Sequence, residues 1–233
     1  MTLDALQFRD RAVYLAESQT LVAADLHLGR GRVDGVAAPV DDAVDLVGRL
    51  EALVAHWSPE RTVLAGDVLD SFCSIPPGVT ERFELLLDRL SRPDHELVLV
   101  AGNHDTMLEH LFDGPVYEEF VVSDAVITHG HREPNGAGEL VVIGHEHPAL
   151  HIEGVKQACY LHAGNVYEGQ DLLVLPSFSP LLRGTGVDHR RDPDCHSPLL
   201  HDGRLVKCRP IVLDVARDEP LVFPPLGSMR RLG

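Results

Sequence analysis

Residues 61–67, RTVLAGD, and residues 96–105, ELVLVAGNHD, are the stretches that decide the fold. In each, a short apolar run rich in Val and Leu ends at a glycine, which is followed by acidic, amide or imidazole side chains. Apolar runs of this length bounded by glycine are typical of buried strands. Ligands bind at the carboxyl ends of strands in an open α/β sheet. The two stretches therefore predict a buried sheet with a polar site at its edge.

Three further polar motifs follow predicted strands in the same way. Asp25-Leu26-His27 follows residues 21–24, His129-Gly130 follows 126–128, and Gly144-His145-Glu146-His147 follows 140–143. If these strands are neighbours, the motifs, together with Gly66-Asp67 and Gly102-Asn103-His104-Asp105, form a single site. Each motif alone is a weak signal, but their joint presence behind apolar runs favours function over chance.

The rest of the chain shows two patterns of predicted secondary structure. Short apolar runs before residue 24 predict hairpin strands. Apolar residues recur every three or four positions over 39–57 and over 80–90, which predicts two helices. Up to about residue 111, strands and helices alternate, which favours a largely parallel sheet with crossover helices. After residue 116 the pattern predicts strands over 117–122, 125–128, 140–143, 149–152, 155–161 and 172–175.

The carboxyl-terminal part has weaker signals. Residues 176–198 are rich in Gly, Pro, Arg and Asp and predict a long loop, and residues 204–215 could add closing strands. Residues 219–233 read as a Pro-rich tail. No internal repeat or shift in composition marks a boundary, so we expect a single α/β domain over residues 1–233.

The composition is that of a globular protein with an unusual charge balance. The 233 residues include 36 Asp and Glu against 20 Lys and Arg, a formal net charge of −16. Lys156 and Lys207 are the lysines. An acidic, lysine-poor surface indicates a halophilic cytoplasm, where salt screens the repulsion. It also offers no overall basic stripe for a nucleic-acid backbone.

Targeting and cysteine patterns point to a cytoplasmic protein. No run approaches ~18 apolar residues, and the N-terminus lacks the apolar core of a secretory signal. Cys73, Cys159, Cys195 and Cys208 stand far apart without a Cys-x-x-Cys pair. This argues against a cysteine zinc site and favours scattered free thiols.

The donor types in the motifs fit two divalent metal ions. The candidate ligands are carboxylate, amide and imidazole groups, from Asp25, His27, Asp67, Asn103, His129, His145 and His147. Mixed oxygen and nitrogen donors without sulfur suit Mn²⁺, with Fe, Zn²⁺ and Ni²⁺ as alternatives. Residues i and i+2 of an extended chain point to the same face. The Asp-x-His and His-x-His pairs can therefore hold one ion or straddle two.

The order DLH, GD, GNHD, HG and GHEH from Asp25 to His147 resembles that of the calcineurin-like metallophosphoesterases. Within them, AVYLAESQTLVAADLHLGRG and LLVLPSFSPLLRGTGV are similar to small archaeal phosphoesterases related to the SbcD nucleases, and to DNA-ligase-associated metallophosphoesterases. The resemblance implies a four-layer αββα sandwich with two packed mixed sheets. It also implies one metal on Asp25, His27 and His147, a second on Asn103, His129 and His145, and Asp67 bridging them.

The resemblance also implies that His104 faces the substrate without ligating a metal. Two cations about 3.5–4 Å apart would neutralise the phosphate oxygens and lower the pKa of a bridging water, so that a hydroxide attacks phosphorus. His104 would then donate a hydrogen bond or proton to the leaving oxygen. Asp105 is expected to orient the His104 ring, and Asp70 to orient a ligand histidine.

Several other residues have open roles. His131 competes with His129 as the ligand, and the family pattern favours His129. His162 and Asn165 either line the cleft or end a strand. Arg30 and Arg32 bind a substrate phosphate or pair with surface carboxylates. Arg183, Arg190 and Arg191 could border the site, whereas the remaining histidines outside the motifs, His196 among them, are assigned surface or capping roles by default.

The sequence thus favours a dinuclear metal-dependent phosphoesterase acting on phosphodiesters, in nucleic acid or a nucleotide. The substrate class is inferred by analogy with the nuclease relatives. The alternatives are a phosphomonoesterase acting on a small metabolite and, less favoured because all ligands and His104 are present, a non-catalytic metal-binding scaffold.

Overall fold

The structure is a computed structural model, and it describes residues 3–29, 32–33, 36–37, 41–70, 75, 78–189, 194–214, 217 and 219–230. Cys73, Arg190 and Arg191 lie outside the described residues, as do Arg30 and the side chain of Arg32, so the roles weighed for these arginines stay predictions. No helix among the described residues is long and apolar enough to cross a membrane.

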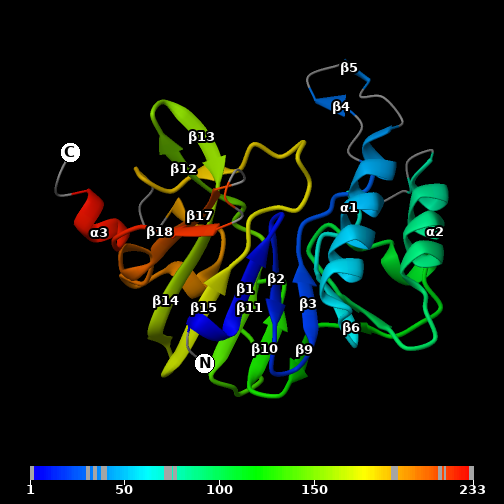
Figure 1. Cartoon of the computed structure of the whole chain (residues 1–233), viewed down its shortest axis with the longest axis horizontal. Helices are drawn as coiled ribbons and strands as arrows, with labels where there is room; N and C mark the ends of the chain where they lie inside the picture. The colour runs from blue at the N-terminus through cyan, green and yellow to red at the C-terminus, as the bar shows by residue number, and fades with distance from the viewer. Residues whose placement is uncertain are drawn as a thin grey trace.

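The first sheet carries the helices of the fold (Figure 1). Its strands, in spatial order, are β1 (Leu6–Arg9), β2 (Ala12–Leu15), β3 (Thr20–Ala23), β6 (Arg61–Ala65), β7 (Glu96–Val100) and β8 (Val116–Tyr117). The first three pair as antiparallel hairpins, and β3, β6, β7 and β8 pair in parallel. Crossover helices α1 (Asp41–Trp57) and α2 (Val79–Leu90) confirm the two predicted helices.

The second sheet is built from the strand-rich part of the chain. Its order is β18 (Glu219–Val222), β17 (Arg209–Asp214), β14 (Tyr160–Tyr167), β15 (Gln170–Val174), β11 (Leu140–Ile143), β10 (Ala125–Thr128) and β9 (Glu119–Val122). Within it, β10, β11 and β15 are parallel, and the other pairs are antiparallel. The α/β class with mixed sheets is therefore as the sequence predicts.

Alternation along the strands explains how the two sheets pack. In the strands next to the site, Leu21, Leu64 and Leu99 face α1 and α2. Their neighbours Val22, Val63 and Val98 belong to a second cluster, which they share with residues of the other sheet such as Ile127, Val142 and Leu173. Because successive side chains point to opposite faces, strands buried on both sides read as continuous apolar runs.

Short elements cover the outer face of the second sheet. They are the 3-10 helices η4 (Pro198–Leu200) and η5 (Leu205–Lys207), helix α3 (Leu226–Met229), and a small sheet of β12 (Pro148–Ile152), β13 (Val155–Ala158) and β16 (Thr185–Gly186). Elsewhere lie η1 (Leu3–Ala5), η2 (Leu108–His110) and the hairpin of β4 (Arg32–Val33) and β5 (Val36–Ala37). Figure 1 shows α3 at the opposite end of the molecule from α1 and α2.

Three parts of the sequence behave differently from expectation. The segment after residue 219 forms β18 and α3, and Leu226 is fully buried, so it is more than a tail. The expected loop over 176–198 contains β16, which pairs with β12. Residues 155–161 are divided between two sheets, because β13 pairs with β12 whereas β14 pairs with β15 and β17. Pairing partners distant in sequence decide each of these features.

Candidate metal centre

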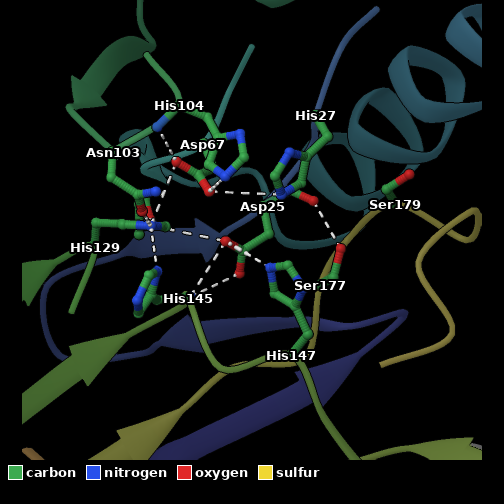
Figure 2. A network of polar contacts seen from close by, with 12 residues as sticks. Asp25, His27, Asp67, Asn103, His104, His129, His145, His147, Ser177 and Ser179 are labelled. Atoms are coloured by element: carbon green, nitrogen blue, oxygen red, sulfur yellow. Dashed lines mark hydrogen bonds and ion pairs between the residues drawn. The ribbon is translucent and has the colours of Figure 1, made fainter. Parts of the chain in front are cut away.

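The predicted ligands meet where parallel strands of both sheets end (Figure 2). Asp25 and His27 follow β3, Asp67 follows β6, and Asn103 and His104 follow β7, all in the first sheet. His129 follows β10, and His145 and His147 follow β11, both in the second sheet. Backbone bonds join the loops: Asp25 N donates to Gly66 O, and His27 N donates to Asp67 O. The packing of two sheets therefore brings all seven side chains into one cluster.

One group of donors contains Asp25, His27 and His147, whose ligand atoms all lie within 4.8 Å of one another. His147 Nε2 lies 3.1 Å from Asp25 Oδ1. His27 Nε2 is buried without a hydrogen-bond partner among the described residues, and Asp67 Oδ2 lies 3.6 Å from it. A buried, unbonded ring nitrogen that faces carboxylates is the arrangement expected of a metal ligand.

A second group contains Asp67, His129 and His145. His129 Nδ1 lies 3.2 Å from Ala65 O and can donate to it. Its other ring nitrogen, Nε2, then faces Asn103 Oδ1 at 3.1 Å, His145 Nδ1 at 3.0 Å and Asp67 Oδ1 at 3.4 Å. When the proton of the neutral His145 ring is on Nε2, all four of these atoms present lone pairs to one another, an arrangement that suits a bound cation. A divalent ion with oxygen and nitrogen ligands fits this requirement.

Asp67 connects these two groups, and with His27 and His104 it forms a third set of donors whose ligand atoms lie within 4.8 Å of one another. Its Oδ1 accepts a hydrogen bond from His104 N at 2.9 Å and lies beside His129, whereas its Oδ2 faces His27. The side chain of Asp67 is 2% exposed. Its two oxygens are therefore placed between the donor groups, as expected of a bridging carboxylate.

Burial and opposite charges set the pKa values in the cluster. Burial alone would raise the pKa of Asp25, but His147 and His129 lower it overall. Burial likewise opposes ionisation of Asp67, yet His129 and the His104 amide hold its pKa well below the usual range. Burial, reinforced by the charge of His129, lowers the pKa of His145 to about 3. The carboxylates are thus ionised and His145 is neutral, which are the states that bind metals.

His129 shows the opposite shift. Burial would lower its pKa, but the hydrogen bond to Asp67 and the charge of Asp25 raise it to about 9. The ring therefore attracts a proton to the position between Asn103, Asp67 and His145. A metal ion would replace that proton there, since ligand nitrogens bind metals only when deprotonated.

The ligand loops have an unusual backbone conformation. Asp25, His27, Asp67, His145 and His147 all have positive φ, between 46° and 68°. Non-glycine residues adopt this left-handed region rarely, and it costs of order 1–3 kcal/mol each. Such strain persists only where surrounding structure holds it. Nine other described non-glycine residues also have positive φ, but five of the seven predicted ligands do, which supports a functional role for the cluster.

Two glycines permit the close approach of the loops. A Cβ at Gly66 would collide with the ring of His129, and a Cβ at Gly102 would collide with the backbone and carboxylate of Asp67. Gly66 also has a φ of 81°. The absence of a side chain at these two motif glycines therefore allows the neighbouring loops to approach closely.

Asp105 does not orient His104, contrary to expectation. Its buried carboxylate accepts hydrogen bonds from the amides of Val68, Leu69 and Gly102, so it braces the loops that carry Asp67 and Asn103. Burial raises its pKa to about 6, despite these amides. Asp70 takes the expected place instead, with Oδ1 3.2 Å from His104 Nδ1 and 3.3 Å from His27 Nδ1.

The structure separates the remaining candidates. His129 is fully buried inside the second donor group, whereas His131 belongs to none of the donor groups found in the described part of the chain. His162 and Asn165 lie in β14, where His162 Nε2 is 3.9 Å from Asp171 Oδ2, and neither lines the cavity over the cluster. Cys159 is a buried free thiol, as expected, and Cys195 and Cys208 are also buried.

A cavity of about 270 Å³ opens over the cluster and contains two residues that the motifs did not reveal. Thr185 and His196 line it together with His104, His145 and His147. The ring of His196 lies 6.0 Å from that of His145, and Ser197 beside it donates its amide to buried Glu146 at 2.6 Å. His196 follows a weakly patterned stretch, so no local signal distinguished it from the other histidines.

Comparisons with known proteins agree with this geometry. The family model described as Calcineurin-like phosphoesterase matches residues 19–189. Among solved structures, the Pseudomonas putida nuclease MPE is similar over 91% of this chain and 92% of its own, with a TM-score of 0.61 and 21% identity. The phosphoesterase YfcE from E. coli is 16% identical over 84% of this chain and 88% of its own, with a TM-score of 0.38. No curated protein matches the chain in sequence.

Proposed function

The chain belongs to the calcineurin-like phosphoesterase family, and on that premise we propose that it is a dinuclear metal-dependent phosphodiesterase. The observation that carries this proposal is the position of Asp67. Its two carboxylate oxygens face separate donor groups, one with Asp25, His27 and His147 and the other with His129 and His145. A shared carboxylate between two such groups is suited to two neighbouring cations.

In this proposal each ion has its own ligands. Asp25, His27 and His147 hold the first ion, and Asn103, His129 and His145 hold the second, with Asp67 shared. Mn²⁺ is the expected metal, and Fe, Zn²⁺ and Ni²⁺ suit the same mixture of donors. Bound divalent ions would neutralise phosphate oxygens and supply a nucleophilic water at neutral pH.

His104 is the proposed catalytic residue. Its side chain is 24% exposed and lines the cavity, while its backbone amide is held by Asp67. With both ring nitrogens protonated, Nε2–H donates to the leaving oxygen of the ester, while Nδ1 faces Asp70 Oδ1 at 3.2 Å. Asp70 acts as a positioning residue, because its carboxylate orients the ring and stabilises the imidazolium.

The diester substrate rests on the motif resemblance to the SbcD-related and ligase-associated branches, which is itself part of the proposal. The Pseudomonas putida neighbour is named a nuclease, which agrees with a diester. At 21% identity, however, that likeness shows the fold alone. A phosphomonoesterase is therefore the alternative that the first experiment must test.

The test is a paired rate assay with Mn²⁺ at high salt, using bis-p-nitrophenyl phosphate as the diester and p-nitrophenyl phosphate as the monoester. His104→Ala serves as the blank for contaminating hydrolases. We expect faster diester cleavage by the native chain and none in the blank. Faster monoester cleavage would make the protein a phosphatase. An inactive chain that purifies without metal would remove the enzymatic proposal altogether.

A further inference from the structure

A groove lined by basic residues lies beside the metal centre. One part of it is a cavity of about 460 Å³ whose charged lining residues are Arg11, Lys156 and Arg183, with no carboxylate among them. A second cavity of about 640 Å³ shares Arg11 and Lys156 with the first and adds Arg9. We call these two cavities together the basic groove. Such a cluster is unexpected in a chain with a net charge of −16.

Two acidic residues line the larger cavity. Each forms an ion pair with an arginine that lies outside the cavity lining. Asp10 forms a bidentate pair with Arg49, both N–O distances being 2.8 Å. Asp214 Oδ2 lies 3.7 Å from Arg217 Nε. By contrast, Lys156 and Arg183 are exposed, and neither pairs with a carboxylate among the described residues. The basic groove therefore keeps a local positive charge that is available to an anion.

The segment from Ser177 to Thr185 forms the wall between the basic groove and the metal centre. Arg11 Nη1 donates to Ser177 O at 3.1 Å and to Ser179 O at 2.8 Å. On the other side, Ser177 Oγ donates to Asp25 O at 2.8 Å, and Figure 2 shows Ser177 beside Asp25. The groove cation Arg11 and the proposed ligand Asp25 thus hold the same stretch of backbone.

The far end of this wall brings an exposed cation close to the centre. Arg183 lines the basic groove, and Thr185, two residues later, lines the cavity over the metal centre. Two residues span at most about 7 Å. Gly184 between them packs against His147 O, and its own carbonyl accepts from Lys156 Nζ at 3.3 Å. Arg183 therefore brings a positive charge close to the cavity over the metal centre, within reach of an extended anion bound there.

We propose that the basic groove binds backbone phosphates of a nucleic-acid strand whose scissile phosphodiester lies at the metal centre. The inference rests on the proposed function and extends it by naming the substrate class. A substrate with a single phosphate would not need a row of cations beyond the site. A strand carries a charge at every nucleotide, and Arg and Lys contacts to phosphates position it without reading its sequence.

The test compares two double charge reversals that change net charge equally. The groove variant is Lys156→Glu/Arg183→Glu. The control variant is Arg89→Glu/Lys207→Glu, at exposed positions outside the basic groove. For each, kcat/KM is measured on a single-stranded 12-mer, as DNA and as RNA, and on bis-p-nitrophenyl phosphate. The readout is the ratio of the oligonucleotide value to the bis-p-nitrophenyl phosphate value.

We expect this ratio to fall at least tenfold in the groove variant and to change less than twofold in the control. Binding of the labelled 12-mer should also become less salt-dependent. The slope of log K against log salt should shrink by about 1.4, at about 0.7 for each strand phosphate that the variant no longer neutralises. If the charge reversal impairs folding, the variant Lys156→Gln/Arg183→Gln, which removes the charges without reversing them, takes its place. Its ratio and its salt slope should also fall.

The outcomes separate the two proposals. If the native chain does not cleave bis-p-nitrophenyl phosphate, the proposed function fails. If it cleaves that diester, but the ratio and the salt slope are the same in the groove and control variants, the role of the basic groove is overturned and the metal centre stands. If the ratio falls for only one of the two 12-mers, DNA or RNA, the proposed role of the basic groove is supported and the type of nucleic acid is identified.

Discussion

Asp70 Oδ1 lies 3.2 Å from His104 Nδ1, so a carboxylate three residues beyond the shared Asp67 orients the ring that faces the cavity. The same oxygen is 3.3 Å from His27 Nδ1. One side chain therefore contacts both a proposed metal ligand and the proposed catalytic residue. This relationship replaces the expected one between Asp105 and His104.

For Asp70→Asn we expect kcat at saturating Mn²⁺ to fall about 10–100-fold, the range typical of groups that orient ligands. The amide cannot stabilise a charged His104 ring, so leaving-group assistance weakens. The loss should therefore be greater for aryl diesters with poorer leaving groups, and a series of substituted phenyl diesters measures it. An equal loss across the series would contradict the positioning role.

His104→Ala should retain its metals and lose turnover by about 10²–10⁴-fold, the usual contribution of a general acid. The reason is that His104 faces the cavity, while the two proposed metal positions have their own ligands. Metal content by elemental analysis and turnover of bis-p-nitrophenyl phosphate measure the two effects. Loss of metal in this variant would show that His104 is itself a ligand.

Asp67→Asn should reduce metal content at both positions, because the amide presents one neutral oxygen where the carboxylate presents two charged ones. Asp25→Asn is the matched comparison, since Asp25 belongs to the first donor group. We expect that variant to lose the first ion preferentially. Elemental analysis after dialysis distinguishes them, and equal loss in both variants would argue against a shared Asp67.

Gly66→Ala should destabilise the fold by at least about 2 kcal/mol, because the new Cβ collides with His129 and Gly66 has a left-handed φ. Gly48→Ala is the control. Gly48 lies within α1 with no atom within 4 Å of an added Cβ, so alanine there should stabilise by up to about 1 kcal/mol. Urea unfolding measures both, and the opposite order would refute the packing argument.

Removal of metal should lower the melting temperature. Mn²⁺ at 100 times its Kd would stabilise the native state by about 2.7 kcal/mol if it binds the folded chain alone. The Asp67→Asn variant should show little of this response. Thermal melts with EDTA and with added Mn²⁺ measure it, and an identical Mn²⁺ response in native and variant chains would place the binding elsewhere.

The motif residues and strand runs were predictable because their signals are local. A run such as residues 61–65 must be apolar to be buried on both faces, and the polar residues that follow it must end the strand. The helices α1 and α2 were predictable from the spacing of residues such as Leu50 and Phe83. Several motif boundaries coincide with the observed strands to within one residue.

The sequence by itself therefore determined the strands next to the site, the helices α1 and α2 and the set of side chains able to bind metal, because these depend on residues near one another along the chain. Only the tertiary structure decided which groups touch. It placed Asp70 rather than Asp105 against His104, brought His196 over the cluster, and gathered Arg11, Lys156 and Arg183 into one groove. Asp70 and His104 follow different strands, Arg11 is more than a hundred positions from Lys156 and Arg183, and His196 lies in a weakly patterned loop. Their approach depends on tertiary packing, which no local pattern encodes.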